Sequence, residues 1–214
     1  MVQGTPASSD IKAVVFDMDG VLCHYSLRTR LERLAAITGL APADIQAAIW
    51  DAGFDLEGDR GRYGADAYLE GFAARLGVAL TREQWLDARA AAMTPNHEVL
   101  ALARGLAQDP ARRCTIATLT NNNLLLKQAI ARVFPELAEL FGRHAYFSAE
   151  FGSAKPDPAV YLAVCERLAI APAQALFVDD SDGHVEGARL AGLQGHHFSS
   201  AAALRQELGQ RKLL

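Results

Sequence analysis

Two pairs of closely spaced aspartates each follow a short apolar run of the sequence. The pairs are Asp17 with Asp19, after residues 13–16, and Asp179 with Asp180, after residues 175–178. Carboxylates held that close repel one another, most strongly where the dielectric is low. A hard divalent cation such as Mg²⁺ relieves the repulsion because it prefers oxygen ligands. The spacing therefore predicts a metal-centred site.

The apolar runs are the elements that must position these aspartates. Runs so short and so apolar are typical of strands buried on both faces, in the middle of a parallel sheet. In an open parallel sheet covered by helices, the carboxyl ends of the strands form the crevice where ligands bind. We therefore expect both pairs to open onto one crevice, although they lie far apart in the sequence.

Polar residues follow other predicted elements in the same way. The strand-like residues 114–119 run into Thr120 and Asn121, and Lys155 precedes a helix that Asp157 is expected to cap. Further strand candidates lie at 145–147 and around His197. Strands that alternate with helices predict an α/β fold with a central parallel sheet, wound right-handedly.

Residues 24–94 interrupt this alternation, because they carry helical patterns and no strand pattern. Helices are predicted in four places, around Leu27, Pro42, Tyr68 and Trp85, the last with a capping box at Thr81 and Gln84. The Gly-rich residues 53–64 show no period and are predicted to be irregular. We expect residues 24–94 to form a helical cap domain inserted into a core of residues 1–23 and 95–214.

Composition narrows the function. Half of the 214 residues are hydrophobic, and the net charge of −4 comes without the basic stripe of a nucleic-acid binder. No apolar run could cross a bilayer, and residues 1–10 lack the pattern of a signal peptide, so neither nucleic acid nor membrane is expected as a partner. Three scattered cysteines, without CxxC spacing, favour a reducing, cytoplasmic location.

Four motifs in this order resemble those of the haloacid dehalogenase-like superfamily, in its phosphatase branch with a helical cap inserted after the first motif. They lie at residues 17–20, 120–121, 155–158 and 179–180, and the resemblance covers residues 11–198. It implies a Rossmann-like three-layer core with a central parallel sheet and a small α-helical cap. The layout is similar to that of small bacterial sugar-phosphate phosphatases, including the glucose-1-phosphate type.

The resemblance implies a role for each motif residue. Asp17 would attack phosphorus and form an aspartyl-phosphate, and Asp19 would act as the general acid and base. Lys155 would neutralise charge on the phosphate and on the nucleophile, while Thr120 and the Asn121 amide would hold phosphate oxygens.

The same resemblance implies a Mg²⁺ site. The ligands would be Asp17, the backbone carbonyl of Asp19 and Asp180, with Asp179 placing a metal-bound water or the lysine. The family often has asparagine where this chain has His184, a position expected to brace the loop.

The sequence excludes one alternative function, disfavours a second and leaves three others open. An EF-hand is excluded, because position twelve counted from Asp17 or from Asp180 is not glutamate. A dehalogenase is disfavoured, because halide leaves without a proton and the family's dehalogenases lack the second aspartate, Asp19. A phosphomutase, a nucleotidase and a non-catalytic metal-binding module with this fold remain possible.

We expect a Mg²⁺-dependent phosphatase, a monomer or homodimer, that acts on a small phosphorylated metabolite. The cap should close over the crevice and set specificity. Arg60, Arg62 and Tyr63 are the best pocket candidates in the cap. Most other cap aromatics are expected in its core.

Overall fold

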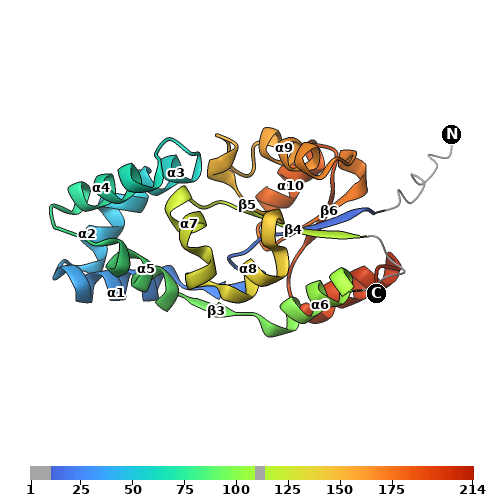
Figure 1. Cartoon of the computed structure of the whole chain (residues 1–214), viewed down its shortest axis with the longest axis horizontal. Helices are drawn as coiled ribbons and strands as arrows, with labels where there is room; N and C mark the ends of the chain where they lie inside the picture. Colours follow the sequence, from blue (N-terminus) through green and yellow to red (C-terminus); the bar gives the residue numbers. More distant parts are fainter. Residues whose placement is uncertain (1–10, 109–113) are drawn as a thin grey trace.

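A computed structural model describes residues 11–108 and 114–214 of the chain. Its centre is a five-stranded parallel sheet with the strand order β5-β4-β1-β6-β7 (Figure 1). The five strands are β1 (Ala13–Phe16), β4 (Thr115–Thr120), β5 (Ala145–Phe147), β6 (Ala175–Asp179) and β7 (Gln194–His197). The strands predicted at both aspartate pairs, and the predicted α/β class, are confirmed.

Strand β1 shows why the sheet needs cover on both sides. Its side chains alternate between the two faces, and all of them are buried. Val14 and Phe16 belong to one hydrophobic cluster, whereas Val15 belongs to another. A polar residue in this strand would therefore lose its hydration on either face, which explains the unbroken apolar run.

Helices supply that cover. Helices α9 (Pro158–Leu168) and α10 (Asp182–Leu190) contribute to the cluster around Val15. Outside residues 24–94, the cluster around Val14 takes its helical residues from α6 (His97–Gln108), α7 (Leu124–Val133), α8 (Pro135–Phe141) and α11 (Ala201–Gln210). Short 3-10 turns span Gly142–His144, Ser148–Glu150 and Pro172–Gln174. Among the described residues, no helix combines the length and apolar character needed to cross a membrane.

A second group of helices lies at the left of Figure 1. In the sequence, these helices come between the two strands of a small antiparallel ribbon. The ribbon pairs β2 (Cys23–Tyr25) with β3 (Met93–Pro95). Between them run α1 (Leu27–Thr38), α2 (Pro42–Gln46) with its π-helical continuation Ala47–Asp51, α3 (Phe54–Asp59), α4 (Ala65–Leu76) and α5 (Arg82–Ala91). We call residues 24–94 the cap and the remainder the core, so the predicted boundaries fall within this ribbon.

Two local predictions were wrong or incomplete. Residues 53–64 were expected to be irregular, but α3 forms there and buries Phe54 and Gly58, one turn apart. A glycine leaves no apolar signal in a sequence pattern, and Gly58 is needed because a Cβ there would overlap the Tyr68 ring. Helix α8 was missed, although Pro135 at its first turn is a favoured start.

Candidate active site

The predicted site residues sit at the carboxyl edge of the sheet. Strand β1 pairs with β6 so that Phe16 lies beside Val178, and the Asp17 N–H donates to the Val178 carbonyl at 2.8 Å. Asp17 and Asp179 are therefore the first polar residues reached at the ends of two adjacent strands. Thr120 ends β4 on the other side of β1, and is also buried.

Lys155 joins the two aspartates. Its Nζ lies 2.8 Å from Asp17 Oδ1 and 2.7 Å from Asp179 Oδ2, and all three side chains are buried. Burial, reinforced by the charge of Asp179, raises the pKa of Asp17 well above its usual value despite Lys155. Burial alone would also raise the pKa of Asp179, but Lys155 and His184 hold that pKa well below its usual value. A further positive charge beside Asp17 would therefore stabilise its ionised carboxylate.

The side chain of Asn121 holds the backbone of Lys155 in place. The Asn121 side-chain Nδ2 donates to the Lys155 carbonyl, and the Lys155 N–H donates to Asn121 Oδ1, both at 2.9 Å. An amide of Asn121 was expected to hold phosphate oxygens, and in this arrangement the side-chain amide is already bonded at both ends. Any contact of Asn121 with phosphate thus falls to its backbone. Thr120 Oγ1, the other predicted phosphate ligand, accepts a hydrogen bond from Asn122 at 2.7 Å.

His184 braces the neighbouring loop, as expected for its position. Its Nδ1 lies 3.1 Å from Asp179 Oδ1, and its backbone carbonyl accepts a hydrogen bond from the Tyr161 hydroxyl at 2.7 Å. Among the residues that the structure describes, Asp17, Asp179 and His184 offer possible ligand atoms within 4.8 Å of one another. Asp180 is not in that group. It is more exposed, and its carboxylate lies directly against Gly20.

Asp19 is held by residues that the sequence analysis did not single out. Arg89 Nη2 lies 2.8 and 2.6 Å from its two carboxylate oxygens, and Asn122 Nδ2 donates to Oδ2 at 3.1 Å. Burial would raise the pKa of Asp19, but Arg89 and Asn122 together keep it below its usual value. Since Arg89 belongs to α5, this ion pair ties the cap to the core.

Both missed residues left a trace in the sequence. Asn122 stands in the polar run that follows β4, beside the predicted Asn121. Arg89 lies three and four residues after Leu86 and Trp85, on the buried face of α5. A charged residue in an apolar stripe usually has a partner, and that was the available signal.

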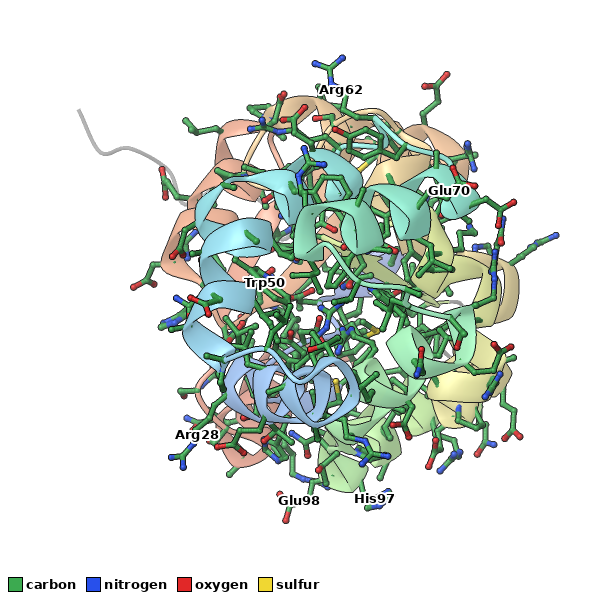
Figure 2. The ribbon with its side chains drawn as sticks, turned by 90° about the vertical axis from the view of Figure 1, so that its left-hand side faces the viewer. Arg28, Trp50, Arg62, Glu70, His97 and Glu98 are labelled. Atoms are coloured by element: carbon green, nitrogen blue, oxygen red, sulfur yellow. The ribbon has the colours of Figure 1, made fainter. Side chains whose placement is uncertain are left out.

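The irregular end of α3 brings cap arginines close to the lysine loop. Arg60 and Arg62 line a pocket of about 450 Å³ together with residues 152–157, which include Lys155. Figure 2, a view onto the cap, shows Arg62 projecting outward at the top. Tyr63 does not line this pocket and packs on Phe54 instead, with ring centroids 5.1 Å apart.

The remaining cap aromatics form a core. Phe54 stacks on Tyr68 at 5.1 Å between centroids, and Phe72 and Trp85 pack edge-on around them. Trp50 meets Phe72 edge-on and is only partly buried. This agrees with the expectation that most of these rings are structural.

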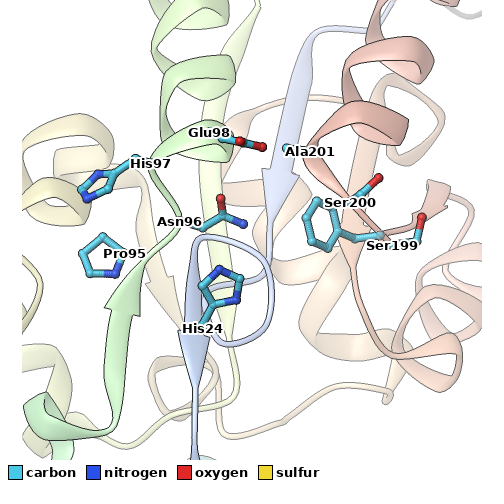
Figure 3. A pocket seen from close by; sticks show the side chains of 9 residues that line it. His24, Pro95, Asn96, His97, Glu98, Ser199, Ser200 and Ala201 are labelled. Atoms are coloured by element: carbon cyan, nitrogen blue, oxygen red, sulfur yellow. The ribbon is translucent and has the colours of Figure 1, made fainter.

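A second pocket, of about 440 Å³, lies where the ribbon meets the start of α11 (Figure 3). His24, Asn96 and Glu98 line one side and Ser199 and Ser200 the other. None of the predicted aspartates lines it, so it is separate from the site at Asp17.

Comparison with known proteins gives a consistent result. A family model described as haloacid dehalogenase-like hydrolase matches residues 11–192. A protein of Mycobacterium tuberculosis named as a phosphatase is 32% identical over 196 residues, which are 87% of this chain and 86% of that protein.

Solved structures show the same fold. A predicted haloacid dehalogenase-like hydrolase of Porphyromonas gingivalis superposes with a TM-score of 0.77 at 24% identity, covering 94% of this chain and 99% of that one. An enzyme of the same family from Bacteroides thetaiotaomicron, in complex with magnesium and inorganic phosphate, gives 0.74 at 22% identity, with 88% and 94% covered. With its sequence motifs, its sheet and these matches in agreement, the chain belongs to the haloacid dehalogenase-like hydrolases.

Proposed function

We propose that this hydrolase is a Mg²⁺-dependent phosphatase that acts on a small phosphomonoester through an aspartyl-phosphate on Asp17. The observation that carries the proposal is that two nearby carboxylates have different partners. Buried Asp17 pairs with Lys155, whereas Asp19, two residues further along the chain, pairs with Arg89. One carboxylate is thereby available as nucleophile and the other as acid and base. The relative from Mycobacterium tuberculosis, which is named as a phosphatase, supports this reading.

The nucleophile is prepared by its surroundings. Asp17 Oδ1 contacts Lys155 Nζ and also accepts from the Met18 N–H at 2.7 Å, so its orientation is fixed. Lys155 offsets the negative charge that an incoming phosphate would bring toward Asp17. Thr120 Oγ1 and the backbone at Asn121 are the candidates to hold phosphate oxygens. Phosphoryl transfer requires mainly such positioning and charge stabilisation.

Asp19 would protonate the leaving oxygen and later take a proton from the attacking water. Its lowered pKa suits the second step, because an ionised carboxylate accepts the proton. The first step needs a protonated carboxyl group, so the Arg89 contact must weaken when substrate is bound. Asp19 is 23% exposed at its side chain and can therefore reach a ligand in the crevice.

The residues at this edge fit a magnesium ion. Asp17 and Asp179 both contact Lys155, and Asp179 also contacts His184, while the Asp180 carboxylate follows on the same loop and lies against Gly20. Asp17, Asp180 and the Asp19 carbonyl would hold the ion, and Asp179 would hold Lys155. When bound, Mg²⁺ would supply charge stabilisation at the phosphate oxygens. The magnesium and phosphate in the Bacteroides relative support this assignment.

We further propose a small metabolite, such as a sugar phosphate, as substrate. The cap lies over the site and touches it through Arg89, which leaves little room for a protein substrate. The pocket beside Arg60 and Arg62 is of the size that suits a small molecule.

Hydrolysis of p-nitrophenyl phosphate, with and without Mg²⁺, tests the proposal. We expect Mg²⁺-dependent turnover that falls by about 10³-fold or more in Asp17→Asn, because the amide is not a nucleophile. Asp44→Asn, in the exposed first turn of α2 and away from the site, is the matched control and should keep its activity. An Asp17→Asn variant as fast as the unmodified protein would show that the nucleophile is wrongly assigned.

A further inference from the structure

Two arginines of the cap are buried with most of their hydrogen-bonding capacity unused. Arg30 on α1 is 3% exposed, and Arg89 on α5 is 1% exposed. Arg89 donates through Nη2 only, whereas its Nε and Nη1 have no partner among the described residues. Arg30 reaches the Tyr25 hydroxyl through Nη1 at 3.4 Å, and its Nε and Nη2 also lack a partner there. Buried guanidinium groups are normally fully bonded, so four unused donors require an explanation.

The two arginines belong to one site, because Tyr25 lies between them. Arg89 Cζ stands 4.4 Å from the centroid of the Tyr25 ring, while Arg30 contacts the hydroxyl of the same residue. The Trp85 ring lies 4.9 Å from Arg30 Cζ, and Trp50, labelled in Figure 2, lies 5.1 Å away. Aromatic faces stabilise a guanidinium charge but accept none of its in-plane N–H groups.

Nearby carboxylates do not complete the site. Within the described part of the chain, Arg30 has no carboxylate oxygen within ion-pair distance, and Arg89 has only Asp19. Asp55 and Asp59 lie near Arg30 but form no ion pair with it among the residues described, and burial raises the pKa of Asp59 well above its usual value. The charges of Arg30 and Arg89 also oppose each other. The site therefore combines two buried guanidinium groups with donor atoms that have no partner in the part of the chain that the structure describes.

Its position relative to the chemistry follows from Arg89. The same guanidinium binds Asp19, the carboxylate that would protonate the leaving oxygen. With Asp19 in that proposed role, groups beyond it toward the cap would face the leaving group of the substrate rather than the transferred phosphoryl group. Arg30 lies one tyrosine ring further into the cap.

We propose that Arg30 and Arg89 bind a second oxyanion of the substrate, a carboxylate or a second phosphate carried by the leaving group. The planar fork of arginine matches both oxyanions and supplies two donors to each. This inference rests on the proposed phosphatase function and specifies its substrate class: a phosphomonoester with an additional negative charge.

Matched esters test it on the unmodified protein. Phosphoglycerate is compared with glycerol phosphate, phosphogluconate with glucitol phosphate, and fructose bisphosphate with fructose monophosphate. We expect kcat/KM to be about 10- to 100-fold higher for the charged member of at least one pair, the effect of one or two charge-assisted hydrogen bonds. The first two pairs test a carboxylate and the third a phosphate.

The results separate the two proposals. No turnover of p-nitrophenyl phosphate or of any ester would defeat the phosphatase function itself. The oxyanion site alone would be overturned if the protein hydrolysed p-nitrophenyl phosphate, or the esters without the additional charged group, and showed no preference for any ester that carries that group.

A variant then assigns the residue. Arg30→Met should lose that preference through a higher KM for the ester with the additional charged group. On the ester without that group, its kcat/KM should stay within about threefold of the parent protein. Arg28→Met, on the same helix but exposed and paired with Glu32, should change neither. An equal loss on both esters would show a structural role and overturn the assignment. If Arg30→Met does not fold, Arg30→Lys keeps the charge, and a smaller but equally selective loss is expected.

Discussion

At the scale of single residues, Gly20 shows how one missing side chain shapes the site. Its φ of +95° lies in the left-handed region, and a Cβ at this position would overlap the Asp180 carboxylate. The chain thus turns sharply after Asp19 and at the same time leaves room for a predicted metal ligand.

We predict that Gly20→Ala lowers activity at least tenfold and raises the Mg²⁺ concentration needed for half-maximal turnover, because Asp180 must move. The strained backbone should also cost about 1 kcal/mol of unfolding free energy. Gly39→Ala is the control, since Gly39 has a φ of +77° but no atom near its Cβ position. Gly39→Ala should lose unfolding free energy, measured in urea, but keep its activity. If Gly20→Ala were as active as Gly39→Ala, the prediction would be wrong.

Asp179 makes a second prediction at this scale. Its folded-state pKa lies below the usual 3.8, so its contribution to stability is complete above that pH and is lost as the pH falls further. Asp179→Asn should therefore cost about 2 kcal/mol at pH 7, where the charged bond to Lys155 is lost. The difference from the parent protein should shrink below about pH 4. Asp17, whose pKa is raised, changes in the opposite sense, and losing the charge of Asp179 lowers the pKa of Asp17 in the variant, so the measured difference belongs to the coupled pair. A difference in urea unfolding that does not change between pH 7 and pH 3 would contradict this.

At the scale of elements, the 3-10 turn Ser148–Glu150 joins the cap to the site. Ser148 is buried, its Oγ donates to the Asp59 carbonyl of the cap at 2.6 Å, and it accepts from the Asn122 N–H at 3.2 Å. Asn122 in turn bonds Asp19. One hydroxyl group thus connects the end of α3 with the proposed acid and base.

We predict that Ser148→Ala loses about 1–2 kcal/mol of stability and also at least tenfold in kcat/KM, because two buried groups lose their partner. Ser200→Ala, which removes the N-cap bond of α11, should lose about 1 kcal/mol and keep its activity. Thermal unfolding and steady-state kinetics measure both effects. If the two variants lost equal stability and neither lost activity, the turn would have no part in positioning the site.

The elements also show what a sequence can reveal. The strands before Asp17 and Asp179 were predictable because burial on both faces leaves an unbroken apolar run. Helix α3 was not, because it buries a glycine and one ring and so has no periodic stripe. The bond between Arg89 and Asp19 spans 70 residues, and no local pattern records which carboxylate a buried arginine will meet.

At the scale of the whole molecule, the cap and the core share one hydrophobic cluster. It contains Val14 and Phe16 of the sheet together with Tyr68, Phe72 and Trp85 of the cap. Helix α7 of the core packs against both α4 and α5 and contributes its buried leucines to the same cluster. Unfolding the cap alone would expose apolar surface of the core, so the two parts should stabilise each other.

We therefore predict a single cooperative thermal transition. Trp50 and Trp85, the two tryptophans of the chain, both lie in the cap, so fluorescence reports on the cap while far-UV circular dichroism reports on all helices. The two midpoints should coincide. Mg²⁺ with phosphate at about 100 times the dissociation constant should raise both together by roughly 5–10 °C, because ligand binds only the folded chain. Asp17→Asn should weaken this shift, as the control for binding at the site. A fluorescence transition that precedes the dichroism transition would mean that the cap unfolds independently, and that the shared cluster does not couple it to the core.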